Sequence, residues 1–96
     1  ENTELHWNEP AEKLHNYIRG LNPFPTAWAI LNDKKYKIHQ GSVVDQKKEG
    51  DIGSITTDHK SYLHIQCNPG ILGLEVIQPE GKKRMGIADF FRGNDI

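Results

Sequence analysis

Two prolines, Pro23 and Pro25, divide this 96-residue chain into a segment with a helical pattern and a longer segment with a strand pattern. Proline lacks a backbone donor and biases the residue before it away from the helical region, so residues 22–25 must form an extended elbow. Before the elbow, apolar residues recur every three or four positions, whereas after it they alternate with polar residues. The chain is therefore predicted to be mainly β-structure behind one N-terminal helix.

The helix is predicted over residues 9–19. Asn8 is a favourable N-cap, and Pro10 falls in the first turn, where its missing N–H costs no hydrogen bond. Gly20 offers a left-handed stop directly after Arg19, whose charge suits the C-terminal end of a helix dipole. The apolar stripe that should face the core consists of Ala11, Leu14, Ile18 and Leu21.

Turn signals divide the remainder of the chain into short strands. Asn32 and Asp33 separate an apolar run over residues 26–31 from an alternating run over residues 35–40, which predicts a β-hairpin. Further strands are expected over residues 42–45, 51–56, 61–67 and 71–77. Strands of this length and spacing indicate a small barrel, and a short apolar helix near the C-terminus is expected to plug one end of it.

Composition favours one small soluble domain. Hydrophobic residues make up 35% of the sequence and the mean hydropathy is −0.70, which suits a thin core. A chain of this length has room for a single core, so we expect one domain over residues 1–96 and a monomer. No apolar run reaches the roughly 18 to 20 residues of a membrane span and no apolar leader opens the sequence, so we expect a cytoplasmic protein without a membrane partner.

Local chemistry is sparse in this sequence. The five histidines are scattered without the H-x-x-x-H spacing of a metal site, and neither G-x-S-x-G nor a Walker loop is present. Cys67 continues the alternation of Leu63 and Ile65 and is expected in the core, not as a nucleophile. His39 and His64 fall on the outward phase of their strands. We expect no metal site and no autonomous active site.

Positive charge is concentrated in two segments although the net charge is −1. A cationic triplet follows Gly81, and no acidic side chain occurs from 81 to 88 to neutralise it. A second basic segment occupies residues 32–48. If the two segments meet in space, they make one face for a polyanion, whereas apart they read equally well as solvated surface. The cations concerned are Lys82, Lys83 and Arg84 in the triplet, and Lys34, Lys35 and Lys37 in the second segment.

Two segments can be read together with these cations. They are Arg19-Gly20-Leu21-Asn22-Pro23-Phe24-Pro25 and Gln78-Pro79-Glu80-Gly81-Lys82-Lys83-Arg84-Met85. In this order and separation they resemble the signature segments of the C-terminal domain of methionyl-tRNA formyltransferase. The same domain in folate dehydrogenases and lipid A modification enzymes fits the second segment less well. The resemblance covers nearly the whole chain, from Leu5-His6-Trp7 to the closing Ala88-Asp89-Phe90-Phe91-Arg92-Gly93.

This chain departs from the family at two positions. The family usually has glycine after the second proline, where this chain has Thr26, which indicates that the backbone there does not need a positive φ. A serine commonly caps the final helix of the family, where this chain has Gly86, a weaker cap.

The resemblance implies a fold and a role. The fold is an open six-stranded Greek-key β-barrel related to the OB fold, joined in cis to an N-terminal catalytic domain that this chain lacks. In translation initiation the parent enzyme transfers the formyl group of 10-formyltetrahydrofolate to methionine on initiator methionyl-tRNA. Its catalytic residues and cofactor belong to the other domain, so this chain alone is expected to be inactive and to position the tRNA through its phosphate backbone.

Three roles for the domain follow, in order of preference. In the first, the six cations named above contact tRNA phosphates. In the second, cations and elbow pack against the catalytic domain without touching RNA, and the candidate contacts are Arg19, Asn22, Pro23, Phe24 and Trp28. The third, an independent single-strand binder, needs exposed aromatic residues on the barrel, where the outward positions offer mainly Lys, His and Gln.

Overall fold

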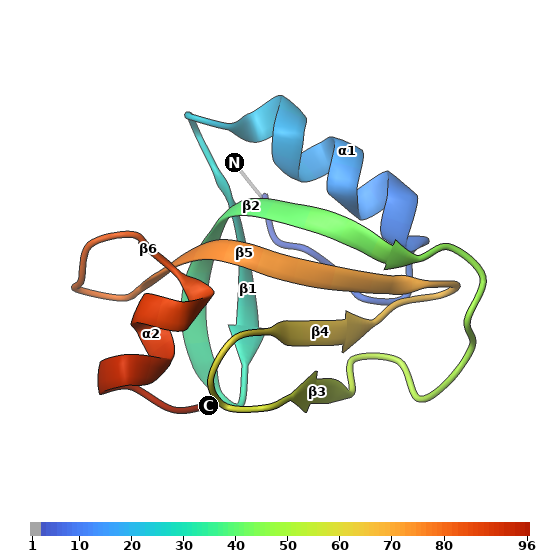
Figure 1. Ribbon diagram of the computed structural model, residues 1–96. Helices are drawn as coiled ribbons and strands as arrows, with labels where there is room; N and C mark the ends of the chain where they lie inside the picture. The colour runs from blue at the N-terminus through green and yellow to red at the C-terminus, as the bar shows by residue number, and fades with distance from the viewer. Residues whose placement is uncertain (1–2) are drawn as a thin grey trace.

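The computed structural model describes residues 3–96 (Figure 1). Its elements are α1 (Ala11–Leu21), β1 (Ala27–Leu31), β2 (Lys34–Asp45), β3 (Ile55–Thr57), β4 (Leu63–Gln66), β5 (Ile71–Pro79), β6 (Met85–Gly86) and α2 (Ile87–Gly93). The strands pair antiparallel in the order β1-β2-β5-β4-β3, and β6 lies beside β5. The prediction of a mainly β fold with an N-terminal helix is confirmed.

The sheet is strongly curved but open. β1 and β3 end the ladder, and no strand pairing among residues 3–96 joins them. The free edge of β1 is occupied instead by the N-terminal segment, because Trp28 N donates to Thr3 O at 3.1 Å and Leu5 N donates to Trp28 O at 2.8 Å. Six antiparallel strands are present as expected, whereas the OB-like barrel is not confirmed.

The N-terminal end of α1 differs from the prediction. Its cap is Pro10, which has no side chain to hydrogen-bond the first turn, in place of Asn8. The backbone N–H of Ala11 is satisfied by the carbonyl of Pro69, 2.9 Å away in the loop before β5. A tertiary contact therefore replaces the local cap that the sequence offered, and the helix begins two residues later than predicted.

The C-terminal end of α1 also lies beyond the predicted stop. Gly20 remains helical, and the helix continues to Leu21 with Asn22 as its cap. The cap residue has φ −91°, so no left-handed residue ends this helix. The predicted apolar stripe is confirmed at Ala11, Leu14 and Ile18, which are buried, and Leu21 is half-buried.

β2 is one long strand where two were predicted. It pairs along its length with β5, and register shifts between Ile38 and Gln40 mark a β-bulge. The bulge turns the side chain of His39 inward, where it is 9% exposed, so the expectation of an outward His39 is wrong. β3 in contrast has only three residues, of which two, Ile55 and Thr56, lie in the predicted range of 51–56.

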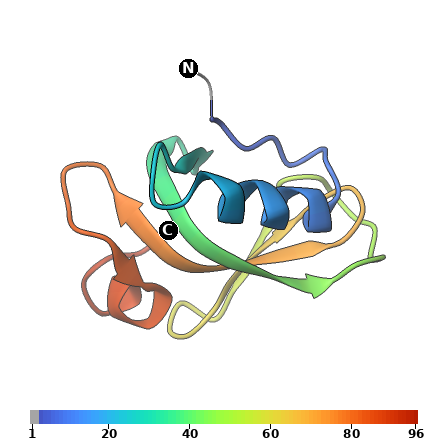
Figure 2. The same ribbon diagram turned by 90° about the horizontal axis from the view of Figure 1, so that it is seen from above.

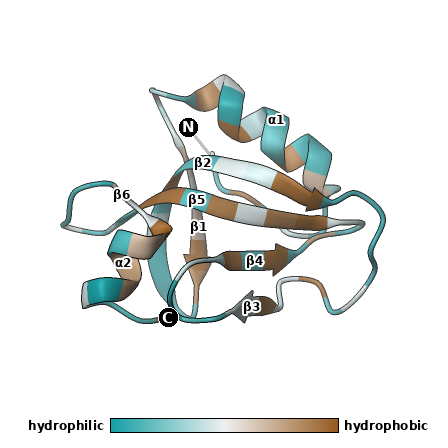
Figure 3. Ribbon diagram, in the orientation of Figure 1, coloured by the Kyte–Doolittle hydropathy of each residue, from teal (hydrophilic) through white to brown (hydrophobic). Residues whose placement is uncertain are grey.

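Both helices complete the core of this sheet. α1 lies across β2, and α2 packs against β5 and β6 (Figures 1 and 2). Phe90 of α2 is buried and meets Tyr36 of β2 edge to face, with ring centroids 5.9 Å apart. Apolar residues follow the strands, whereas the turn between β5 and β6 is hydrophilic (Figure 3). In the described part of the chain, neither helix has the length and apolar character needed to cross a membrane.

Cys67 lies in this core, as predicted, with 1% of its surface exposed. Burial raises the pKa of its thiol to about 11, so the thiol stays protonated and unreactive at neutral pH. His64 on the neighbouring strand is half-buried against Tyr62, and desolvation lowers the pKa of its imidazole. Among residues 3–96, no cluster of three or more His, Cys, Asp or Glu is arranged to hold a metal ion.

Candidate nucleic-acid interface

The two basic segments lie side by side. The register of β2 and β5 sets Tyr36 opposite Pro79 and Lys37 opposite Gln78. The lysines at the start of β2 therefore border the turn of residues 80–84 that joins β5 to β6 (Figure 1). The sheet thus brings together segments that are more than forty positions apart in the sequence.

Two grooves mark this junction. The larger, with a volume of about 420 Å³, is lined by Lys34, Lys35 and Lys82. The smaller, of about 220 Å³, is lined by Lys35 and Lys37 with the beginning of the turn. Lys83 and Arg84 line neither groove and are exposed on the turn. The structure therefore assembles four of the six predicted cations and leaves two at the edge. We call the six cations and these two grooves the basic surface.

Carboxylates also line the basic surface. The larger groove carries Asp33, which lies within the second basic segment, and Glu80 and Asp95, which lie outside both basic segments. Asp95 is hydrogen-bonded to His59 at 2.7 Å, and this bond lowers the pKa of its carboxyl. These carboxylates reduce the positive potential that a phosphate meets, so the surface is suited to weak attraction of a polyanion.

Uncharged partners hold two of the cations. The ammonium of Lys82 donates to Oδ1 of Asn94 at 2.9 Å, and that of Lys35 lies 4.5 Å from the ring centroid of Trp28. None of the ion pairs within 4.0 Å among residues 3–96 involves the six cations. The charges of Lys82 and Lys35 are thus positioned without being neutralised by an ion pair. Asn94 carries no sequence signal for this role, because only the packing of α2 brings it to the turn.

The elbow forms a second exposed feature. Arg19, Asn22, Pro23 and Phe24 are all exposed, and Phe24 is 85% exposed at the tip. In both views the elbow lies on the same side of the molecule as the 80–84 turn (Figures 1 and 2). Trp28, predicted to contact another domain together with these residues, is half-buried on β1 and lies beside Lys35 of the basic surface.

Thr26 anchors the elbow in a conformation that the sequence did not predict. Its φ is +79°, so the expectation that this position avoids a positive φ is wrong. The conformation is tolerated because Thr26 N donates to Leu21 O at 2.9 Å and its hydroxyl donates to Pro23 O at 2.9 Å. Its carbonyl accepts from the hydroxyl of Thr3 at 2.8 Å. The glycine usual in the resembling family marks the same backbone requirement.

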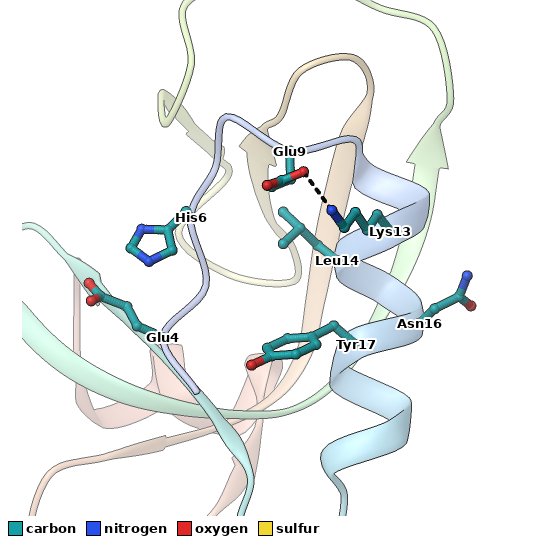
Figure 4. A pocket seen from close by; sticks show the side chains of 7 residues that line it. All are labelled: Glu4, His6, Glu9, Lys13, Leu14, Asn16 and Tyr17. Carbon is teal, nitrogen blue, oxygen red and sulfur yellow. Dashed lines mark hydrogen bonds and ion pairs between the residues drawn. The ribbon is translucent and has the colours of Figure 1, made fainter. Parts of the chain in front are cut away.

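A further hollow, of about 460 Å³, lies between the N-terminal segment and α1 (Figure 4). Glu4 and Glu9 line it, and Glu9 is paired with Lys13 at 3.1 Å. Its acidic lining is unfavourable for a polyanion, so it is not part of the candidate interface. Its other lining residues are His6, Leu14, Asn16 and Tyr17.

The curved six-stranded sheet, its two helices and the paired signature segments define a known class of domain. The chain belongs to the formyl transferase C-terminal domain family, which it matches over residues 1–95. By sequence it is similar to the methionyl-tRNA formyltransferases of Clostridium acetobutylicum, 38% identical over 97% of this chain, and Parabacteroides distasonis, 40% identical over 93%. It spans 30% and 29% of the lengths of those relatives. The resemblance read from the sequence is thereby confirmed.

Solved structures share the fold. HypX from Aquifex aeolicus, in complex with tetrahydrofolic acid, superimposes with a TM-score of 0.72 over 96% of this chain and 17% of that one. A HypX variant with four substitutions gives a TM-score of 0.71. At 14% and 13% sequence identity, these likenesses describe the fold alone.

Proposed function

We propose that this chain is the tRNA-binding C-terminal domain of a methionyl-tRNA formyltransferase. The parent enzyme transfers the formyl group of 10-formyltetrahydrofolate to methionine on initiator tRNA, in the cytoplasm. This proposal is supported by relatives that carry the enzyme's name and match nearly the whole of this chain. The remaining 70% of their length is where we place the catalytic residues and the folate site.

The observation that carries the tRNA-binding role is the meeting of two basic segments at the β2–β5 register. Lysine and arginine contacts to phosphates are independent of base sequence, which suits a domain that orients a tRNA. Fixing a bound substrate lowers the barrier of a reaction without any local chemistry. The domain thus contributes by holding the tRNA while its acceptor end reaches the catalytic domain joined in cis.

The role is tested by replacing Lys82, Lys83 and Arg84 together with alanine. Binding of an initiator tRNA transcript is measured by fluorescence anisotropy at two salt concentrations. Each lost phosphate contact should reduce the slope of log affinity against log salt by about 0.7 to 0.9, so we expect weaker binding and a slope smaller by up to ~2 to 3.

The matched control is the triple alanine variant of Lys13, Lys47 and Lys48, which removes the same charge. These lysines belong to the start of α1 and to the loop after β2, two segments at the opposite end of the molecule from the turn (Figure 1). It should lose less affinity than the variant of the turn. Equal losses of affinity in the two variants would show that tRNA binding depends only on net charge. An unchanged affinity in the turn variant would show that the triplet is not part of the binding site.

A docking role is the second candidate, and the exposure of Phe24 favours it. Aromatic residues are enriched at protein–protein interfaces, and Phe24 is exposed next to the exposed Pro23. In this second role the elbow packs against the catalytic domain. The two roles are compatible because the elbow and the basic surface are formed by different residues.

A further inference from the structure

The turn of residues 80–84 is connected to a buried histidine by hydrogen bonds. The β2 bulge places His39 inside the fold, with Nε2 2.8 Å from Oε1 of Gln78. Gln78 lies on β5, one residue before the end of that strand. Its amide nitrogen donates to the backbone carbonyl of Lys82 at 2.9 Å. The path runs from the core through one side-chain amide to the backbone of the cationic turn.

The direction of each hydrogen bond follows from the donors available. Because the amide nitrogen of Gln78 donates to the Lys82 carbonyl, its oxygen faces His39 and must accept. Nε2 of His39 therefore carries a proton and donates it to this oxygen. The other ring nitrogen, Nδ1, is buried and has no hydrogen-bond partner among residues 3–96. A buried nitrogen without a hydrogen bond costs free energy that an apolar side chain would not incur. The contribution that a histidine makes at this position is therefore its hydrogen bond to Gln78.

The turn is held at few points. Lys82 N donates to Pro79 O at 3.1 Å, and the Lys82 ammonium is held by Asn94. The side chains of Lys83 and Arg84 form no hydrogen bond or ion pair within the described part of the chain. Their positions depend on the turn backbone, which Gln78 fixes through the Lys82 carbonyl.

We infer that His39 and Gln78 are positioning residues for the cationic turn. They present Lys82, Lys83 and Arg84 in a pre-ordered arrangement, which reduces the ordering cost when phosphates bind. The benefit for RNA rests on the proposed tRNA-binding function, whereas the ordering of the turn does not. Because neither residue is one of the six cations, their contribution is separable from the charge of the basic surface.

The test uses Gln78→Ala in the 96-residue chain and two readouts. Hydrogen exchange of the Lys82 amide, which donates to Pro79 O, is measured without RNA and should become about five- to tenfold faster, the factor that one lost hydrogen bond supplies. Affinity for an initiator tRNA transcript should fall by a similar factor, with an unchanged salt slope because no cation is lost. Gln46→Ala, at an exposed glutamine in the loop after β2, is the matched control and should change neither readout.

Substitution of His39 separates positioning from packing. His39→Gln retains a nitrogen donor near the position of Nε2, so hydrogen exchange in the turn should stay as slow as in the unsubstituted chain. His39→Asn carries its amide nearer the place of Nδ1 and should not. Equal effects of the two variants would show that only the buried volume of the ring matters and would overturn the role of His39.

The outcomes distinguish the inference from the proposed function. Unchanged exchange in Gln78→Ala overturns the inference whatever the RNA result. Faster exchange with unchanged RNA affinity overturns its functional half. A third outcome is faster exchange in Gln78→Ala together with no tRNA binding by the unsubstituted chain. This outcome supports the positioning of the turn and counts against the proposed function alone.

Discussion

Gly70 is the residue at which backbone conformation and tertiary packing constrain the sequence together. It adopts φ +102°, a region that side chains disfavour. A Cβ at this position would lie 2.6 Å from the carbonyl oxygen of Asp45 and 3.0 Å from Cβ of Ala11. Its own N–H donates to Lys48 O at 2.8 Å, and its carbonyl accepts from Cys67 N at 2.7 Å. The loop cannot shift to make room without losing these contacts.

Gly70→Ala is therefore expected to lower the free energy of unfolding by more than about 2 kcal/mol, from backbone strain and steric overlap. Urea denaturation followed by circular dichroism measures the change. The control is Gly20→Ala in α1, where a Cβ meets nothing within 4 Å. That substitution should raise the free energy of unfolding by up to ~1 kcal/mol through helix propensity. Destabilisation of equal size in both variants would contradict this account.

At the scale of elements, α2 is short and depends on its packing. It has seven residues, and Gly86 caps it without a side-chain hydrogen bond, as the sequence predicted. Phe90 is buried against Tyr36 and Phe91, so the helix is stable because of this contact and not because of its caps. The backbone of Gly86 has φ −68° and ψ 160°, the extended conformation that a capping serine adopts.

Gly86→Ser is expected to stabilise the protein, because a serine hydroxyl would accept from a free N–H in the first turn of α2. The space is available, since the nearest atom to a Cβ at this position is Glu75 O at 3.8 Å. Gly86→Ala controls for the reduced flexibility of the unfolded chain. The serine variant should exceed the alanine variant by about 0.5 to 2 kcal/mol in chemical denaturation. Equal stability of the two would mean that the hydroxyl forms no cap.

The whole molecule presents the elbow and the basic surface on one side (Figures 1 and 2). Such an arrangement lets one domain contact a protein neighbour and a nucleic acid simultaneously. Phe24 contributes little to the core, because 85% of its surface is exposed. Its conformation is fixed nevertheless by the hydrogen bonds of Thr26.

Phe24→Ser is expected to leave the free energy of unfolding within about 0.5 kcal/mol of its original value, as for other exposed positions. It should weaken association with the N-terminal region of the parent enzyme, supplied in trans and measured by calorimetry. A side chain that anchors an interface contributes about 2 kcal/mol or more, or roughly a thirtyfold change in affinity. Ile52→Ser, at an exposed isoleucine in the loop before β3, is the control. Association that Phe24→Ser does not alter would exclude the elbow tip as the anchor.

Sequence alone was sufficient wherever the determining interactions are local. The helical stripe, the hairpin at Asn32 and Asp33 and the inward Cys67 all follow from periodicity and turn chemistry, which act over a few residues. Residues 22–25 instead form a turn, closed by the bond from Thr26 N to Leu21 O, and not the extended elbow that the prolines predicted. The family followed from two short segments, and the six cations were named from charge alone.

Tertiary structure decided what depends on contacts between distant segments. Pro69, 58 positions along the chain from Ala11, accepts from the Ala11 amide at the end of the helix that Asn8 was predicted to cap. Residues 3–5 take the edge of β1 that a barrel would need. The β2 bulge moved His39 from the surface into the core and connected it to the cationic turn. The meeting of the basic segments is likewise a property of strand register. Register and edge pairing are set by the packing of the whole sheet, so no local pattern in the sequence specifies them.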